Sequence, residues 1–380
     1  MGPGRPRRRR AQPRARPGRA GGSARRVTTR IGIVGCGTIA QAHSRSLKAI
    51  IKAGLVDAAV VATHDIDTAR AEAFARAHGA DVAADADALL DGVDAVWVCT
   101  PTSSHLPLVE AAAGRGVAIF CEKPLAPTLA EAEALTHAAA VARVPAQVGL
   151  VLRTSPVFVA LREEVTSGVL GRPMAVSFRD DQFFPIQGHY ASTWRGDVTV
   201  AGGGTLLEHS IHDLDVLRHC LGEVTEVTAR TANYAGHDEI EDVAVTLLSF
   251  ASGATAALVS VWHDVLTRPS GRRVEVFCER GLVWLDDDFS GPLHVETTAG
   301  TEVRPCPPPD WVTALPWSDD STMIVVSHYA EANRAFLDAI ATGRAPRPGL
   351  EEGLAAHRLA DAVYRSARQG RPVGIALLSR

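Results

Sequence analysis

The chain of 380 residues lacks several patterns that would assign its class at once. Its six cysteines are scattered, with no CxxC pair, and no HExxH motif occurs. We therefore expect no structural metal site and no disulfide framework, but reduced and mostly packed thiols in a cytoplasmic protein. No run of about 18 uncharged apolar residues is present, so we expect no membrane span.

Acidic residues are absent from the first 30 positions, which carry eleven arginines. Residues 1–29 are rich in Arg, Pro and Gly, and so poor in large apolar side chains that we predict a disordered tail. An arm that binds an anionic surface stays open as an alternative, but no aromatic side chains are interleaved to stack on bases, so we expect no nucleic-acid partner. Arg25-Arg26 is followed by a strand and turn rather than an uncharged signal segment, which argues against export.

The remaining chain is acidic, with 28 basic against 43 acidic residues, and long enough for two domains. Residues 30–148 alternate short, continuous apolar runs with alanine-rich helical segments, which predicts a doubly wound α/β domain with a parallel sheet. The expected strands are 31–34, 58–63, 95–99, 118–121 and 146–151, and the expected helices are 40–53, 67–78, 105–114 and 129–141.

Residues 149–380 change to longer β-prone segments separated by glycine turns, which predicts a second α/β domain with a large, mostly antiparallel sheet. The expected strands are 174–179, 224–231, 242–250, 254–262, 273–278, 282–285 and 294–298. Helices are expected at 204–221, 326–342 and 350–369. No internal repeat of fixed period is apparent.

The most informative segment is the first apolar run, which breaks directly into Gly35-Cys36-Gly37-Thr38-Ile39-Ala40. In a dinucleotide-binding fold, this GxGxxA pattern gives a tight turn, close approach of backbone N–H groups to a pyrophosphate, and tight packing of the next helix. The helix then presents the positive end of its dipole to the phosphates. Glycine turns also join strands to helices where no ligand binds, so the motif needs support from its surroundings.

Asp65 ends the second predicted strand, 25 residues after the motif. An acid at this position of a Rossmann unit accepts hydrogen bonds from the adenosine ribose and repels a 2′-phosphate, which favours NAD over NADP. Arg70 lies near enough in sequence to keep NADP open. The alternative is a structural role for Asp65, with Asp67, in capping the next helix.

Two further strands end in polar loops, Cys99-Thr100-Pro101-Thr102-Ser103-Ser104-His105 and Cys121-Glu122-Lys123-Pro124. Ligands of open α/β sheets bind beyond the carboxyl ends of the strands, so we expect both loops in the cofactor cleft. Lys123 would be desolvated there, and the bond to Pro124 could be cis. Read alone, the first loop could also be an ordinary capped helix start.

A polar stripe marks the predicted helix 204–221. Glu208, His212, Asp215 and His219 fall within about 60° of arc beside an apolar face. Such a stripe is costly if buried without partners, so we considered a structural hydrogen-bond network, a zinc-type site and substrate chemistry, and favour the last.

Together, the ordered motifs GCGTIAQAH, Asp65, CTPTSSH, FCEKPLA, VGLVLRTSPVF and GGGTLLEHSIHDLDVLRHCLG resemble those of the glucose-fructose oxidoreductase and inositol dehydrogenase family (Gfo/Idh/MocA), from about residue 30 to 375. The resemblance implies a Rossmann domain followed by an α/β domain with an open sheet. It also implies NAD(P)-dependent redox chemistry on sugars, inositols or related polyols, in homodimers or homotetramers. By resemblance, Lys123 and His212 match the family's catalytic pair, and Glu208 stands where the family more often has Asp.

From these motifs we expect a site of the following composition. The cofactor would be held by Gly35, Cys36, Gly37, Thr38, Ile39, Asp65, Thr100, Pro101, Thr102, His105, Glu122 and Lys123, and the substrate by Lys123, Arg153, Trp194, Glu208 and His212, with Lys123, His212 and Glu208 catalytic. His212 would take the hydroxyl proton as hydride leaves, Lys123 would stabilise the alkoxide, and Asp215 could restrain the imidazole. Surface ion pairing and core packing remain alternatives for Arg153 and Trp194.

Two other functions stay open at this point. A glycoside hydrolase that uses NAD in transient redox would share the same motifs, with no net oxidation. A non-catalytic, nucleotide-dependent binding protein is disfavoured because both Lys123 and His212 are present.

Overall fold

The computed structural model describes residues 28–187, 191–265, 271–288, 291–317 and 319–375. The predicted disordered tail lies outside these ranges except for its last two positions, and Thr29 already begins the first strand.

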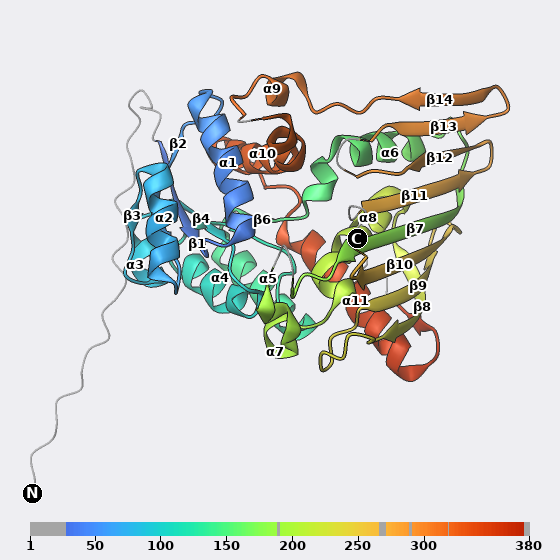
Figure 1. Cartoon of the computed structure of the whole chain (residues 1–380), viewed down its shortest axis with the longest axis horizontal. Coiled ribbons are helices and arrows are strands. Elements are labelled where there is room, and N and C mark those ends of the chain that lie inside the picture. Colours follow the sequence, from blue (N-terminus) through green and yellow to red (C-terminus); the bar gives the residue numbers. More distant parts are fainter. Residues whose placement is uncertain (1–27, 188–190, 266–270, 289–290, 318, 376–380) are drawn as a thin grey trace, which may run out of the picture.

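Six strands form the first sheet, in the order β3-β2-β1-β4-β5-β6, and all its neighbours pair in parallel (Figure 1). The strands are β1 (Thr29–Val34), β2 (Ala58–His64), β3 (Asp81–Val82), β4 (Ala95–Val98), β5 (Ala118–Cys121) and β6 (Ala146–Val148). Every residue of β4 and β5 is buried, which explains why these strands appear in the sequence as unbroken apolar runs. The prediction of a doubly wound parallel sheet is confirmed.

Five helices connect these strands: α1 (Thr38–Lys52), α2 (Thr68–His78), α3 (Ala86–Asp91), α4 (His105–Gly114) and α5 (Leu129–Ala142). The sequence did not predict α3 or the two-residue strand β3, because both are too short to show a hydrophobic period.

Nine strands form the second sheet, in the order β14-β13-β12-β11-β7-β10-β9-β8-β15. They are β7 (Pro173–Phe183), β8 (Val224–Ala232), β9 (Val243–Phe250), β10 (Thr255–His263), β11 (Gly271–Cys278), β12 (Gly281–Leu285), β13 (Leu293–Thr297), β14 (Gly300–Arg304) and β15 (Val373–Gly374). All neighbours are antiparallel except β7 and β10, which pair in parallel. The prediction of a mostly antiparallel sheet is confirmed, although β14 and β15 were missed.

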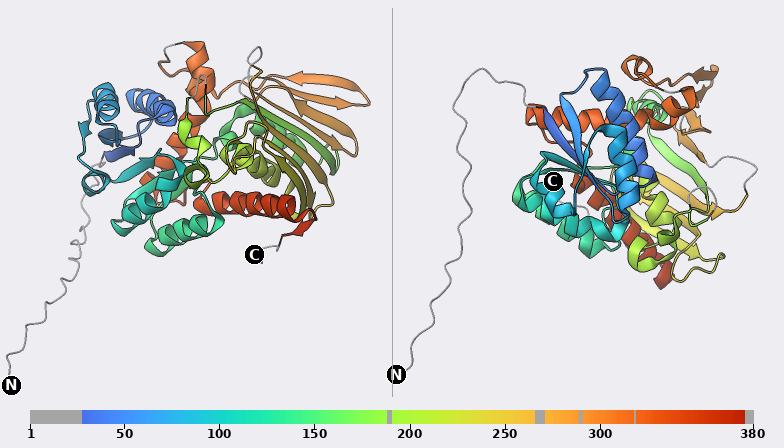
Figure 2. Two further views of the ribbon diagram at one scale, coloured as in Figure 1. Left: turned by 60° about the horizontal axis from the view of Figure 1, so that its bottom comes forward. Right: turned by 60° about the vertical axis from the view of Figure 1, so that its left-hand side comes forward.

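Three helices pack on one face of the second sheet: α6 (Pro156–Thr166), α8 (Ile211–Leu221) and α11 (Leu350–Gln369). The other face carries no helix of the described residues (Figures 1 and 2). Two short helices, α7 (Val198–Ala201) and α9 (Asp310–Thr313), lie in connecting segments. Among the helices that the structure describes, none has the length and apolar character needed to cross a membrane.

Helix α10 (Asp320–Thr342) returns from the second sheet and packs against α1 on the first (Figure 1). Its Phe336 ring lies 5.3 Å from the Trp97 ring and 5.7 Å from the Phe120 ring, between centroids. The helix begins six residues before the predicted start at Val326. The division into residues 30–148 and 149–380 therefore stays a prediction, because α10 belongs to the second range but packs on the first sheet.

The predicted continuous helix over 204–221 is wrong. The chain forms a π-helical turn at Thr205–His209, breaks at Ser210, and only then begins α8. The N–H groups of Gly204 and Leu206, at the start of this turn, donate to the buried Glu241 carboxylate at 2.8 and 2.9 Å and so fix where the turn begins. Single turns of this kind occur often at functional sites.

A buried histidine joins α11 to the segment after β5. The backbone N–H of Leu125 donates to Nε2 of His357 at 2.8 Å, so this nitrogen carries no proton. Burial, with a smaller contribution from His105, lowers the pKa of His357 from 6.5 to about 3.

We expect His357 to make the fold sensitive to acid. Between pH 3 and about 6.5 the unfolded chain binds a proton at this residue that the folded chain does not, so stability falls as the pH falls through this window and is restored above it. The residue alone should cost about 2 kcal/mol at pH 5 relative to pH 7. His357→Gln keeps an acceptor for Leu125 but does not titrate.

Urea unfolding of both proteins at pH 5 and pH 7 measures this effect. The difference in unfolding free energy between the two pH values should be smaller in His357→Gln, and an equal difference in both proteins would contradict the assignment.

Candidate active site

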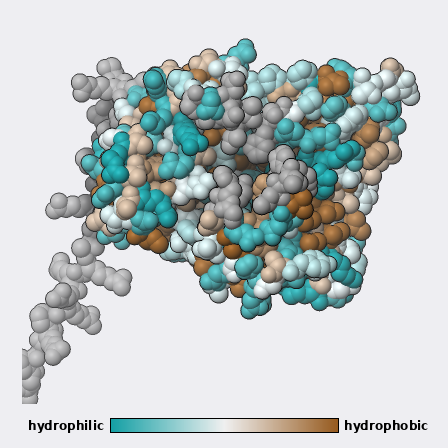
Figure 3. Space-filling model, in the orientation of Figure 1, coloured by the Kyte–Doolittle hydropathy of each residue, from teal (hydrophilic) through white to brown (hydrophobic). Residues whose placement is uncertain are grey.

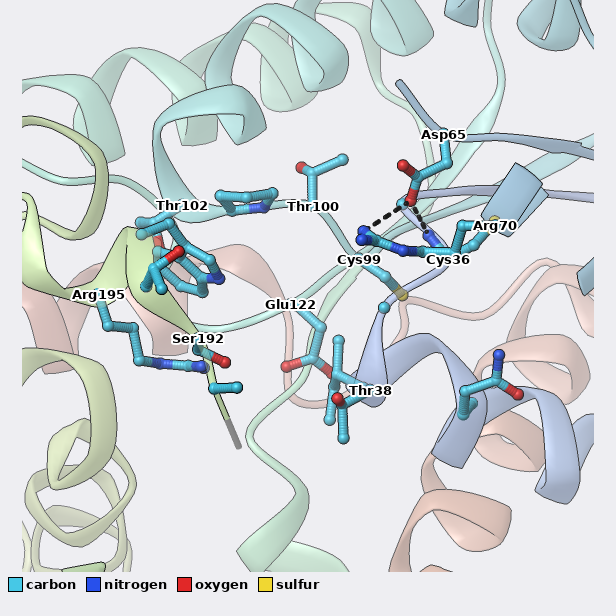
Figure 4. A pocket seen from close by; sticks show the side chains of 18 of the residues that line it. Cys36, Thr38, Asp65, Arg70, Cys99, Thr100, Thr102, Glu122, Ser192 and Arg195 are labelled. Atoms are coloured by element: carbon cyan, nitrogen blue, oxygen red, sulfur yellow. Dashed lines mark hydrogen bonds and ion pairs between the residues drawn. The ribbon is translucent and has the colours of Figure 1, made fainter. Parts of the chain in front are cut away.

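A pocket of about 590 Å³ opens at the carboxyl ends of β1, β4 and β5 (Figure 4). Its wall is formed by Gly35, Cys36, Gly37, Thr38, Ile39, Gln41, Asp65, Arg70, Cys99, Thr100, Pro101, Thr102, Glu122, Lys123, Ala191, Ser192, Thr193, Trp194 and Arg195. The structure thus brings together the glycine motif and both polar loops that the sequence singled out. Gln41 and the segment 191–193 were not predicted, because no spacing rule connects them to the cleft.

The glycine loop leaves room for a ligand and supplies donors to it. Gly35 has a φ of 85°, and a Cβ there would lie 2.7 Å from the Cys99 carbonyl, so this position requires glycine. A Cβ on Gly37 would meet nothing within 4 Å. Helix α1 begins directly after Gly37, with no side-chain cap and no acid in its first turn, so its free N–H groups can bind an anion.

Asp65 lies beside Cys36 of this loop (Figure 4). Its carboxylate accepts hydrogen bonds from the N–H groups of Cys36 at 2.7 Å and Asp67 at 2.8 Å. The side chain of Asp67, rather than that of Asp65, caps α2. Arg70 approaches Asp65 to 3.7 Å and is half exposed. A carboxylate, a cationic side chain and unpaired N–H groups around one cavity fit the ribose and phosphates of a dinucleotide.

Lys123 in the pocket wall joins the two parts of the chain. Lys123, from the end of β5, donates to the backbone oxygen of Glu208 at 2.5 Å. The Glu208 carboxylate is buried, and accepts hydrogen bonds from the Thr102 hydroxyl at 2.8 Å and the Arg195 guanidinium at 2.9 Å. Burial lowers the pKa of Lys123, and Glu208 offsets part of this effect. The peptide bond from Lys123 to Pro124 is cis.

The turn that carries Glu208 is held by Glu241, which the sequence analysis missed. A Cβ on Gly204 would lie 1.8 Å from the backbone oxygen of Glu241, so the third glycine of the Gly202–Gly204 run is required by this contact. The Tyr364 hydroxyl donates to the side-chain carboxylate of Glu241 at 2.9 Å. The glycine run was a usable signal of close backbone approach, but nothing in the sequence named its partner.

His212 lies one turn further along and is 8 % exposed. Its Nδ1 is buried and has no hydrogen-bond partner among the described residues. Burial, and then the positive charges of Lys123 and Arg272, lower the pKa of His212 well below its usual value. The ring is therefore neutral.

Arg272 itself was not predicted. It is buried at the start of β11, with its guanidinium 2.5 Å from Asp213 and 2.7 Å from Asp288. These ion pairs fix a permanent positive charge near His212.

Four predicted site residues are not part of the pocket wall: Glu208 and His212, which are described above, and Arg153 and His105. Arg153 does not line the pocket, because its guanidinium makes two hydrogen bonds to Asp215, at 2.7 and 2.6 Å. Asp215 therefore anchors Arg153 instead of restraining His212. His105 is also behind the wall, where its ring nitrogens lie 2.9 Å from the Pro124 oxygen and 3.0 Å from the Thr100 oxygen and connect the two polar loops.

Trp194 does line the pocket, with the Arg195 guanidinium 4.3 Å above its ring. Among the described residues, no group of three or more His, Cys, Asp or Glu side chains could hold a metal ion.

The match to known families agrees with this geometry. Residues 29–150 match the model of the oxidoreductase family with an NAD-binding Rossmann fold, and residues 158–284 match the GFO/IDH/MocA C-terminal domain. The chain belongs to the Gfo/Idh/MocA family. As a Gfo/Idh/MocA protein it is an oxidoreductase with an NAD-binding domain, so the predicted family, class of enzyme and cofactor are confirmed.

Similar Gfo/Idh/MocA proteins include dehydrogenases. Inositol 2-dehydrogenase of Rhizobium meliloti is 31% identical, over 92% of this chain and 100% of the relative, and D-apiose dehydrogenase of Paraburkholderia graminis is 31% identical, over 90% and 88%. Among solved structures, a putative myo-inositol dehydrogenase from Sinorhizobium meliloti 1021 superposes with a TM-score of 0.74 at 29% identity, over 92% and 100% of the two chains. Levoglucosan dehydrogenase, in complex with NADH and levoglucosan, shares the fold, with a TM-score of 0.79 at 23% identity over 92% and 99%.

We expect Asp65→Ala to weaken NADH binding by about 10- to 100-fold, since it removes a charge-assisted bond to the glycine loop and the acceptor for a ribose hydroxyl. The variant should also discriminate less against NADPH. Titration of NADH and NADPH by cofactor fluorescence measures both effects.

Asp67→Ala is the matched control. It removes the cap of α2 and should cost about 1 kcal/mol of stability, with NADH affinity retained. Equal NADH affinity in Asp65→Ala and the wild type would contradict the assignment.

Proposed function

We propose that the protein is a dehydrogenase that reversibly oxidises a hydroxyl group of a sugar, inositol or related polyol. The observation that carries this proposal is the bond from Lys123 to Glu208, which brings an ammonium group and a buried carboxylate together where the cofactor loops meet the turn before α8. A polyol offers adjacent hydroxyls that such donors and acceptors recognise. The dehydrogenase names of the relatives support the same class of substrate.

Each residue has a distinct part in the proposed reaction. The glycine loop and Asp65 would hold NAD, which would supply the acceptor for the hydride of the substrate carbon. His212, held neutral by burial and by the nearby cations, takes the hydroxyl proton and returns it in the reverse direction. Lys123 donates to the reacting oxygen and stabilises its developing negative charge. Glu208, fixed by Thr102 and Arg195, binds a second hydroxyl.

NAD rather than NADP is the proposed physiological cofactor. Asp65 places a buried negative charge at the pocket wall, and Arg70 is partly neutralised by Asp65 and Asp67, with separations of 3.7 and 3.5 Å. The Asp65 carboxylate would repel the 2′-phosphate of NADP, and Arg70, already paired with two carboxylates, would attract it only weakly.

The reaction is tested by following NADH formation with myo-inositol, scyllo-inositol, D-apiose and levoglucosan. The same substrates are assayed with NADP in parallel. A separate assay follows the release of p-nitrophenol from a p-nitrophenyl glycoside. We expect NAD reduction with at least one polyol or sugar. Glycoside hydrolysis without net NADH formation would overturn the proposal in favour of a redox-assisted hydrolase.

His212→Asn and Lys123→Met should each lower kcat by about 10²- to 10⁴-fold, because each removes a group that acts in the transition state. NADH affinity should stay within a few-fold in both. The matched control is His219→Ala, two turns along α8 and beside Arg153 and Arg162 rather than Lys123, which should keep wild-type turnover. Wild-type turnover in either active-site variant would refute the mechanism.

We also propose a homodimer or homotetramer that works in the cytoplasm. The helix-free face of the second sheet exposes Val245, Leu247 and Phe277 at 42, 52 and 43 %. Apolar side chains gather on the surface over the second sheet (Figure 3). An exposed apolar sheet face of this kind is suited to a second copy of the chain. All six cysteines are free thiols, which supports a reducing compartment.

Leu247→Glu should shift the protein to the monomer, because it places a charge in the apolar sheet face. Light scattering coupled to size-exclusion chromatography measures the mass. Val141→Glu, at a residue 67 % exposed on α5, is the control and should leave the mass unchanged. An unchanged oligomer in Leu247→Glu would exclude this face as the interface.

A further inference from the structure

A buried chain of hydrogen bonds leads from the wall of the cofactor pocket to α10. Nε2 of His43, on α1, lies 2.8 Å from Oε1 of Glu122, and its Nδ1 lies 2.8 Å from Oδ1 of Asn333. The indole N–H of Trp97 donates to the same Asn333 oxygen at 2.9 Å. His43, Asn333 and Trp97 are completely buried, and Glu122 is 4 % exposed.

The partners in this chain determine where the protons lie. An indole N–H can only donate, so the Asn333 atom that faces Trp97 must be the amide oxygen. The Asn333 amide nitrogen accordingly donates to the Ser46 hydroxyl at 2.5 Å. Because that oxygen is an acceptor, Nδ1 of His43 must carry a hydrogen.

One further proton must therefore lie between His43 and Glu122. If both Nε2 and Oε1 were unprotonated, two acceptors would face each other at 2.8 Å in a site with no water contact at His43. An imidazole is more basic than a carboxylate, which favours the proton on His43. Two aromatic rings pack against the imidazole in T-shaped contacts, with centroids 4.8 Å away at Phe120 and 5.1 Å away at Tyr329. Aromatic rings near a cation stabilise it.

The carboxylate of Glu122 is also fixed in position, by a hydrogen bond and by close packing. Its Oε2 accepts the backbone N–H of Lys123 at 3.1 Å. A Cβ at Gly149 would lie 2.6 Å from Oε1, so the carboxylate occupies the space that this glycine leaves. Glu122 is therefore a fixed part of the pocket wall, between the glycine loop and the lysine.

We propose that His43 is a positioning residue of the active site, which forms a buried imidazolium–carboxylate pair with Glu122 and so keeps this wall of the cofactor pocket in one orientation and without net charge. An uncompensated carboxylate at this wall would repel the phosphates of the dinucleotide. The pair also makes α10, through Asn333, part of the support of the cofactor site. The inference rests on the proposed function only in that the pocket binds NAD.

The first test is the protonation state of His43 in the full-length protein with [¹⁵N]histidine. Both ring nitrogens should carry hydrogen at pH 7, and Glu122→Gln should convert the ring to the neutral form with hydrogen on Nδ1. The other titratable groups that face the pair are Cys99, Cys121, Lys123, His105, His328 and Tyr329. A neutral His43 in the wild type at pH 7 would overturn the proposal.

The second test separates charge from shape. His43→Gln can still donate a hydrogen bond to Glu122 but brings no positive charge, so the NADH dissociation constant should rise about tenfold. The double variant His43→Gln/Glu122→Gln removes the uncompensated charge and should bind NADH about 3- to 10-fold more tightly than His43→Gln. A double variant that binds as weakly as His43→Gln would show a purely structural role.

Ser46→Ala is the matched control, because the Ser46 hydroxyl bonds the Asn333 amide and the backbone oxygen of His43 but neither the imidazole nor the Glu122 carboxylate, and NADH affinity should be unchanged. Thermal unfolding of each variant establishes that it is folded. Neither measurement requires turnover or a substrate, so an error in the proposed substrate class would leave both results intact.

Discussion

The active site depends on one contact between distant parts of the chain, the hydrogen bond from Lys123 to the backbone oxygen of Glu208. Lys123 follows β5 of the parallel sheet, and Glu208 precedes α8, which packs on the second sheet. The Glu208 side chain is buried and Lys123 is partly buried, and a buried ammonium or carboxylate without partners costs several kcal/mol. The two sheets are therefore held in the one relative position that satisfies Lys123, Glu208 and Arg195 together.

The same constraint sets the charge of the site. Lys123 and Arg272 lower the pKa of His212, and burial acts in the same direction. A neutral imidazole is the form that can accept a proton, and a nearby ammonium is the group that can stabilise an alkoxide. The ammonium of Lys123 would stabilise the alkoxide, and, although it lowers the basicity of the imidazole, it also keeps that imidazole unprotonated. Arg272 can serve this purpose because Asp213 and Asp288 fix it.

The sequence predicted the elements whose signals are local. Continuous apolar runs located β1, β2, β4 and β5, and the residues placed at their ends do line the pocket. The start of the π-helical turn could not be predicted, since it depends on Glu241, 37 residues away from Gly204. Asp215 has the helical spacing of a partner for His212, but Arg153 reaches it first from another segment. The edge strand β14 was missed because almost all of it is exposed, so no buried period marks it.

The segment 191–195 connects cofactor and substrate recognition. It contributes to the wall of the cofactor pocket, and its Arg195 also fixes the Glu208 carboxylate. The Arg195 side chain therefore connects the wall of the cofactor pocket directly to the Glu208 carboxylate. Since α10 packs on α1 and α11 contacts α5, α8 and β8, the two layers share helices and resist rigid-body opening. Coupling between cofactor and substrate in this protein should accordingly pass through side chains of the pocket wall rather than through a hinge.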